Sequence, residues 1–199
     1  MMRPFIYGAL LLLFSGCSGG GIRLAETLSH AEKIVAEAPD SVLRLLRELP
    51  TDALRSRELR ARYALLQAEA AERAGTPNNN DSILRIAWEY YRKHPHEIRG
   101  ICKTLYYRGQ SRLRQGDKPG ALRLFLEVEE KLRPIDEPYY LGLLYLRIGG
   151  VYRAELNFVR AYRYYRDARD LFIRSDAARQ TTEAQLGMTV SALRMRDLG

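Results

Sequence analysis

Residues Tyr145–Ala168, YLRIGGVYRAELNFVRAYRYYRDA, indicate the fold most directly. They contain a step of small residues at Gly149, and similar steps occur at Gly109 and Gly187, which places the three steps 40 and 38 residues apart. Apolar residues recur around each step at helical spacing. Repeated units of this size cannot bury their apolar faces alone, and stacking gives them one continuous core. The sequence therefore predicts an all-α solenoid of helical hairpins.

The unit around Gly149 resembles a tetratricopeptide repeat (TPR). The resemblance is carried, in order, by Tyr145, Ile148, Gly149, Tyr152, Ala161, Tyr165 and Ala168. A second copy runs through Leu105, Gly109, Gly116, Asp117, Ala121, Phe125 and Val128, and a third stops after Leu186 and Gly187. The resemblance implies about four helix pairs and a terminal helix, with a concave surface that holds a partner protein.

The N-terminus has the pattern of an export signal. Arg3 precedes an apolar run that ends at Phe14, and this run is shorter than the roughly 20 residues that span a bilayer. The Ser-Gly pair before Cys17 resembles the lipobox of bacterial lipoproteins, although Phe14 stands where leucine is usual. The resemblance implies acyl chains on Cys17 that anchor the protein to a membrane. The alternative is an ordinary secretory signal. We expect a signal peptide at 1–16, a lipidated cysteine and flexible tether at 17–22, and a helical repeat domain at 23–199.

Loss of the signal leaves one cysteine, Cys102, which cannot form an internal disulfide. Its apolar neighbours Ile101 and Leu105 predict a buried position. The net charge of +8 becomes +7 without Arg3. An exported chain does not meet nucleic acid, so this charge favours an acidic protein partner or an anionic membrane surface.

Nine helices and no strand are expected after the tether. The first runs from Leu24 to Pro39, the third from Arg55 to Ala74, and two pairs follow at about 97–135 and 138–175. Asp40-Ser41 and Asp81-Ser82 are typical N-caps and predict the starts of the second and fourth helices. A last helix is expected at about 177–197; its Leu186, Met188, Val190, Leu193 and Met195 predict an outer face more apolar than a capping helix needs.

Nearly the whole chain resembles the TPR lipoproteins of Bacteroidetes. The matching pieces are Ala38-Pro39-Asp40-Ser41, Asn80-Asp81-Ser82-Ile83, Trp88-Glu89-Tyr90-Tyr91, Tyr106-Tyr107-Arg108-Gly109 and Ile148-Gly149-Gly150-Val151-Tyr152. The resemblance implies a lipoprotein that faces the periplasm, with the outer membrane as the expected location. It also implies that Ser41 and Ser82 are possible O-glycosylation sites, which competes with their reading as helix caps.

A groove lined by the first helix of each pair is the expected binding site. The repeat pattern places Lys103, Tyr106, Gln110, Arg114, Leu143, Leu146, Arg147 and Arg153 on its inner surface. Tyrosine and arginine suit an acidic peptide, because arginine grips carboxylates with paired hydrogen bonds. The set partly resembles the carboxylate-clamp TPR domains, although Gln110 and Gly150 replace the asparagines of that clamp. The alternative is an ordinary solvated basic face.

No pattern for catalysis, a cofactor or a metal was found. His94 and His96 flank Pro95 without metal-ligand spacing, and the acidic residues Glu127, Glu129 and Glu130 are expected on a solvated helix face. The run Tyr162–Arg166 resembles a nucleic-acid stacking strip, but Tyr165 falls on a core position.

These observations favour a lipid-anchored TPR scaffold that binds another envelope protein. The alternatives are the N-terminal sensor portion of a membrane signalling protein and an outer-membrane assembly factor.

Overall fold

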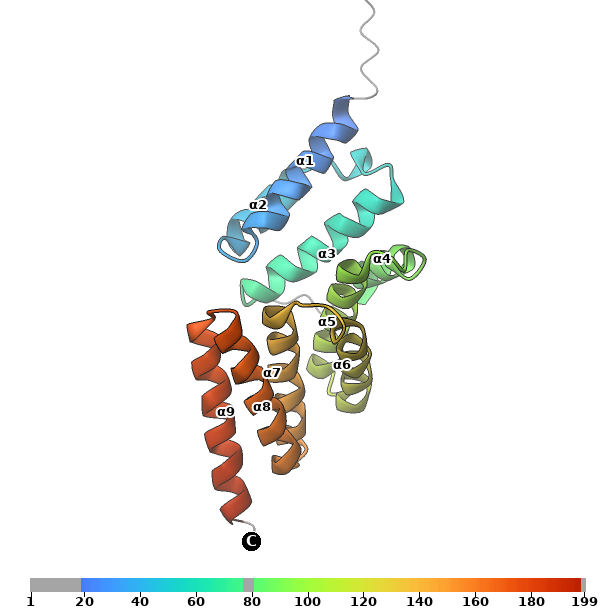
Figure 1. Ribbon diagram of the computed structural model, residues 1–199. Coiled ribbons are helices and arrows are strands. Elements are labelled where there is room, and N and C mark those ends of the chain that lie inside the picture. Colours follow the sequence, from blue (N-terminus) through green and yellow to red (C-terminus); the bar gives the residue numbers. More distant parts are fainter. Residues whose placement is uncertain (1–18, 77–80, 198–199) are drawn as a thin grey trace, which may run out of the picture.

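The computed structural model describes residues 19–76 and 81–197. Within these ranges the chain forms nine α-helices and no strand, which confirms the all-α prediction (Figure 1). The helices are α1 (Gly19–Ile34), α2 (Pro39–Glu48), α3 (Arg57–Arg73), α4 (Asp81–Tyr91), α5 (Ile98–Arg114), α6 (Lys118–Leu132), α7 (Pro138–Ala154), α8 (Phe158–Arg174) and α9 (Ala178–Asp197), with a short 3-10 turn, η1, at Thr51–Ala53.

The helices pack as a solenoid of adjacent hairpins. Helices α3 and α4, α5 and α6, and α7 and α8 form pairs, and α9 packs against both α8 and α7. The first helices of the pairs also touch one another, α1 with α3 and α3 with α5. We call the side formed by α3, α5, α7 and α9 the inner face.

Glycines allow the two helices of a pair to approach closely. A Cβ atom at Gly109 would lie 2.3 Å from Phe125 Cε1, and one at Gly149 would lie 3.0 Å from the Tyr165 ring. These contacts join α5 to α6 and α7 to α8, as the repeat pattern predicts. The close packing therefore requires a residue without a side chain at Gly109.

The third small-residue step is not a third copy in the same register. Helices α5, α7 and α9 begin at Ile98, Pro138 and Ala178, so the structural period is constant at 40 residues. Gly187 lies two residues short of that register, and its Cβ position is 2.7 Å from the Tyr165 ring. It permits close packing of α9 on the preceding helix, whereas Gly149 permits packing within its own pair.

Three core clusters are joined by helices that are buried on two sides. In α3, Leu66 and Ala70 belong to the N-terminal cluster, whereas Ala64 and Leu65 belong to the central one. In α7, Leu146 packs with α8 and α9 in the C-terminal cluster. Helix α3 therefore joins the N-terminal and central clusters.

The flexible tether predicted at the N-terminal end was wrong for residues 19–22. Helix α1 begins at Gly19, so residues 19–22 belong to a helix and not to a flexible tether. A glycine costs a helix only about 1 kcal/mol, and the buried Leu24 and Leu28 hold the helix that extends back over the glycines. The predicted signal peptide and Cys17 lie outside the described residues.

The predicted cap of α2 was also wrong. The N-cap of α2 is Ala38, without a side-chain hydrogen bond, and Pro39 is the first helical residue. Proline suits that position because its fixed φ fits the first turn and its missing N–H would have no partner there. Asp40 and Ser41 therefore lie inside the first turn, and Ser82 is likewise the second residue of α4.

Four helices end in a residue with a left-handed backbone. Gly75 and Gly116 end α3 and α5 with φ of 71° and 80°. The equivalent residues after α7 and α8 are Leu156 and Asp176, with φ of 59° and 52°. Glycine adopts this conformation without strain, whereas leucine does not.

The described helices include none with the length and apolar character needed to cross a bilayer. On α9, Leu186 and Leu193 are 64% and 47% exposed, whereas Met188 is 9% exposed and belongs to the C-terminal core, so the apolar outer face predicted for this helix is exposed only in part.

Candidate functional site

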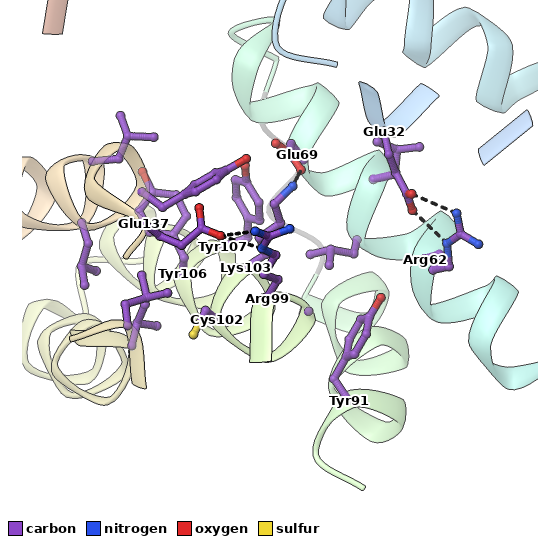
Figure 2. A pocket seen from close by; sticks show the side chains of 18 of the residues that line it. Glu32, Arg62, Glu69, Tyr91, Arg99, Cys102, Lys103, Tyr106, Tyr107 and Glu137 are labelled. Atoms are coloured by element: carbon purple, nitrogen blue, oxygen red, sulfur yellow. Dashed lines mark hydrogen bonds and ion pairs between the residues drawn. The ribbon is translucent and has the colours of Figure 1, made fainter. Parts of the chain in front are cut away.

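The inner face carries a cavity of about 390 Å³, which we call the first hollow (Figure 2). It is lined mainly by the first helices α1, α3, α5 and α7, with buried side chains of α4 and α6 behind them. Its walls are chiefly apolar and aromatic: Leu65, Leu66, Leu143, Tyr91, Tyr106, Tyr107 and Tyr140. A cavity of this size is within the range of small-ligand sites.

A buried carboxylate lies at the wall between α3 and α5. Glu69 is 2% exposed, and it accepts hydrogen bonds from Lys103 Nζ at 2.9 Å and from Arg73 Nε at 3.1 Å. A charge buried to this extent needs such partners, because an unpaired carboxylate would be costly. Lys103 also lies over the Tyr140 ring, 5.7 Å from its centroid.

Two further ion pairs surround the first hollow (Figure 2). Arg99 at the start of α5 pairs with Glu137, which precedes α7. Arg62 of α3 donates two hydrogen bonds of 2.9 Å to Glu32 of α1. Each carboxylate that lines the first hollow is therefore paired with a cation.

The thiol and buried phenol groups of the first hollow favour their neutral forms. Burial raises the pKa of Cys102 to about 11, so its thiol is protonated at neutral pH. Burial also raises the pKa of Tyr107 well above its ordinary value, and that of Tyr106 as well. Cys102 is 4% exposed, which agrees with the buried position predicted for it. The arrangement suits binding by shape and apolar contact.

The second hollow, of about 500 Å³, lies between α5, α7 and α9. Its walls include the charged side chains Lys118, Arg147, Arg153 and Glu183 and the apolar side chains Leu146, Leu186 and Val190. Arg147 Nε donates to the Tyr106 hydroxyl and Arg153 Nε donates to the Tyr165 hydroxyl, both at 3.3 Å. Within the described ranges neither arginine forms an ion pair.

The predicted groove residues are divided between these places. Lys103, Tyr106 and Leu143 line the first hollow, and Leu146, Arg147 and Arg153 line the second. The hydrogen bond between Arg147 and Tyr106 joins the two hollows.

The two remaining groove residues, Gln110 and Arg114, line neither hollow. They donate to Glu72 of α3 at 3.2 and 2.7 Å. The sequence did not indicate that Glu69 would pair with Lys103, or that Glu72 would accept hydrogen bonds from Gln110 and Arg114. A carboxylate between Leu66 and Ala70, two buried positions of one helix, could have pointed to Glu69.

Glu129 corrects the prediction of a fully solvated acidic face. It is 7% exposed and accepts hydrogen bonds from Arg133, Tyr145 and Tyr164 at 2.7, 3.1 and 3.3 Å. Glu130 is exposed and Glu127 is half-buried. The cause is register, because Glu129 follows the core residue Val128 and faces the neighbouring pair.

Other residues noted in the sequence have local roles. Tyr165 is 5% exposed, at the predicted core position, while Arg163 and Arg166 are exposed. His94 Nδ1 lies 2.8 Å from the carbonyl oxygen of Tyr90 at the end of α4. Ser41 Oγ accepts a hydrogen bond from Arg44. The described part of the chain contains no group of three metal-ligating side chains.

Comparison with known protein families, with characterised proteins and with solved structures found no match for this chain.

Proposed function

We propose that this chain is a lipid-anchored, TPR-type scaffold of the bacterial cell envelope, which binds another protein on its inner face. The TPR assignment is supported by the period of 40 residues between the starts of α5, α7 and α9, and by the glycines at the close crossings of α5 with α6 and of α7 with α8. It is supported further by the stacking of adjacent hairpins into one core, which is how repeats of this kind are stabilised.

The observation that carries the proposal is the pair of arginines in the second hollow. Tyrosine hydroxyls hold the Nε atoms of Arg147 and Arg153, so the two guanidinium groups are oriented before a partner arrives. Their terminal nitrogens can donate paired hydrogen bonds to a carboxylate. Leu146, Leu186 and Val190 add apolar contact area beside them. This combination suits an acidic segment of a partner protein.

The distribution of charge supports the same surface. Residues 98–197 contain 19 lysines and arginines and 12 acidic residues, whereas residues 17–97 contain 12 of each. The entire positive excess of the chain after Cys17 therefore belongs to the part that forms the second hollow. A positive field at this end would increase the rate at which an acidic partner is captured.

The membrane anchor is proposed from the sequence alone. The Ser-Gly-Cys step at Cys17 follows an apolar run that is too short to span a bilayer. Lipidation of this cysteine would hold the repeat domain close to the membrane, with about two acyl chains needed for durable attachment.

A crosslinked pull-down from the native envelope tests the proposal. The full-length protein is compared with Arg147→Glu/Arg153→Glu, with Cys17→Ala, and with the control Arg123→Glu/Arg163→Glu, which reverses two exposed charges on the outer helices α6 and α8. We expect one defined partner to be lost with the inner-face reversal and retained with the outer-face control. Equal retention by both double variants would refute binding at the second hollow. Loss of membrane association should accompany Cys17→Ala.

A sensor portion of a membrane signalling protein is the second candidate, and one observation favours it. Leu193 is 47% exposed on α9, the last described helix, and does not line the second hollow. Concentration-dependent association that Leu193→Glu abolishes would support a docking role for this helix.

A further inference from the structure

The two hollows of the inner face differ in the chemistry that they accept. The first hollow is walled by Leu143, Tyr106 and Tyr140 and backed by the buried side chains Val128 and Leu132. Burial of a large apolar or aromatic side chain in such a site is favourable, because the free energy gained grows with the apolar area that is removed from water. Its volume of about 390 Å³ leaves room for one side chain of that kind.

Each of the four cations around the first hollow is already paired with a glutamate. Glu69 holds Lys103, and Glu137 holds Arg99. A carboxylate that entered this hollow would approach two glutamates whose cations are engaged. The first hollow therefore disfavours an acidic side chain.

The cations farther along α5 are engaged in the same way. Gln110 and Arg114 both donate hydrogen bonds to Glu72 of α3. The sequence predicted that these two side chains would contact an acidic ligand, and Glu72 takes the place of that ligand. On α7 the hydrogen-bond partners change, because Arg147 and Arg153 donate to tyrosine hydroxyls. Glu183 also lines the second hollow but forms no ion pair with either arginine among the described residues. Recognition of a carboxylate is consequently confined to the second hollow.

The geometry points to a partner segment with two separate determinants, a bulky apolar side chain that fills the first hollow and a carboxylate that binds Arg147 and Arg153 in the second. The two hollows meet at the hydrogen bond between Arg147 and Tyr106, so one continuous segment can reach both. This inference rests on the proposed function, because it names the chemistry of the partner that the inner face would hold. The glutamates of α3 supply the selectivity, since they prevent the acidic determinant from binding beside α5.

Fluorescence anisotropy with synthetic peptides tests the inference on the full-length protein in detergent. The probes are fluorescein-labelled peptides that carry one Trp and an Asp-Glu pair, in both orders, separated by Gly-Ser spacers of increasing length. Matched probes replace the Trp with Ser or the Asp-Glu pair with Asn-Gln. The probe with both determinants at the best spacing should bind about tenfold more tightly than either matched probe.

Three protein variants locate the determinants. Tyr140→Ala and Leu143→Glu alter the first hollow, and either should remove the advantage of Trp over Ser while the advantage of Asp-Glu remains. Arg153→Glu should remove the advantage of Asp-Glu and leave that of Trp. Arg163→Glu, on the outer face of α8, is the charge control and should change neither. Tyr140 is partly exposed, so its truncation should leave the fold intact even if Leu143→Glu does not.

The outcomes separate this inference from the proposed function. If Asp-Glu matters but Trp and Ser probes bind equally, the apolar determinant is refuted and the acidic groove stands. If Trp matters equally in wild type, Tyr140→Ala and Leu143→Glu, its site is not the first hollow and the inference is overturned. If none of the probes binds at any spacing, the acidic-peptide function and this inference are both overturned.

Discussion

The substitution Gly109→Ala tests the close packing on which the repeat assignment depends. The new Cβ would lie 2.3 Å from Phe125 Cε1 and 2.8 Å from Cδ1, and Phe125 is completely buried. The ring cannot withdraw without displacing other core side chains, and such overpacking costs about 1–3 kcal/mol. Because the contact is so short, we take the upper end. Alanine returns about 1 kcal/mol through its higher helix propensity, so we expect a net loss of about 2 kcal/mol.

The same substitution at Gly150 is the matched control. Its nearest neighbour would be the Tyr165 hydroxyl at 3.7 Å, an ordinary van der Waals contact. Gly150→Ala should therefore gain about 0.5–1 kcal/mol from helix propensity alone. Both glycines lie inside first helices of their pairs, so the two variants differ mainly in the space beside the new methyl group.

Urea unfolding followed by far-UV circular dichroism measures both changes in the free energy of unfolding. The double variant Gly109→Ala/Phe125→Leu should recover part of the loss, because leucine is smaller and has more rotamers. The reasoning is refuted if Gly109→Ala is as stable as wild type, or if Gly150→Ala loses as much stability as Gly109→Ala.

Three further predictions concern strain and titration. Leu156→Gly should raise the free energy of unfolding by about 0.5–1 kcal/mol, because Leu156 is 72% exposed and has a φ of 59°. This conformation costs a non-glycine residue about 1–2 kcal/mol. A lower free energy of unfolding in urea would contradict the prediction. Cys102, whose pKa burial raises to about 11, should react with a thiol reagent at pH 8 only after unfolding; rapid native labelling would show an accessible thiolate. Burial, with Glu129 nearby, raises the pKa of Tyr145 to about 12, so the contribution of its neutral form to stability should be complete below about pH 10 and disappear as the pH rises to 12. Tyr145→Phe should reduce the fall of the free energy of unfolding with pH over this range, and an unchanged fall would argue against the predicted contribution.

The positions of the later helices could be predicted closely because local residues determine them. Asp117 caps α6 by accepting a hydrogen bond from the Gly120 amide, and Asn157 caps α8 in the same way from Arg160. Pro138 begins α7, where its missing amide hydrogen costs nothing. The expected ranges of these pairs therefore agree with the structure to within a few residues.

The start of the domain was harder to predict because local propensity gave the wrong answer. A run of glycines is typical of a tether, but Leu24 and Leu28 are buried in the N-terminal core and stabilise the helix that includes residues 19–22. The Asp-Ser pair at Asp40 has typical capping residues, but the proline before it takes the first helical position. Tertiary packing and one residue of register decided these two cases.

The candidate site could be predicted only in part. The repeat pattern identified Arg147 and Arg153 as inner-face residues, and the structure places both in the second hollow. It also identified Lys103 and Arg114, but their charges are taken up by Glu69 and Glu72, which lie 34 and 42 residues away in the sequence. No local pattern indicates which glutamates of α3 face which cations of α5.

By itself, the sequence determined the helical class, the hairpin repeat and the glycines at the helix crossings, because helical spacing, proline and glycine act over a few residues. Only the tertiary structure decided the true register of Gly187, the two buried faces of α3 and the difference between the hollows. These features depend on how neighbouring pairs rotate and pack against one another. A rotation of a helix by a single residue moves each side chain by about 100° around its axis. The physical reason is that charge pairing across the inner face joins residues of separate hairpins, and their distances are defined only when the stack has formed.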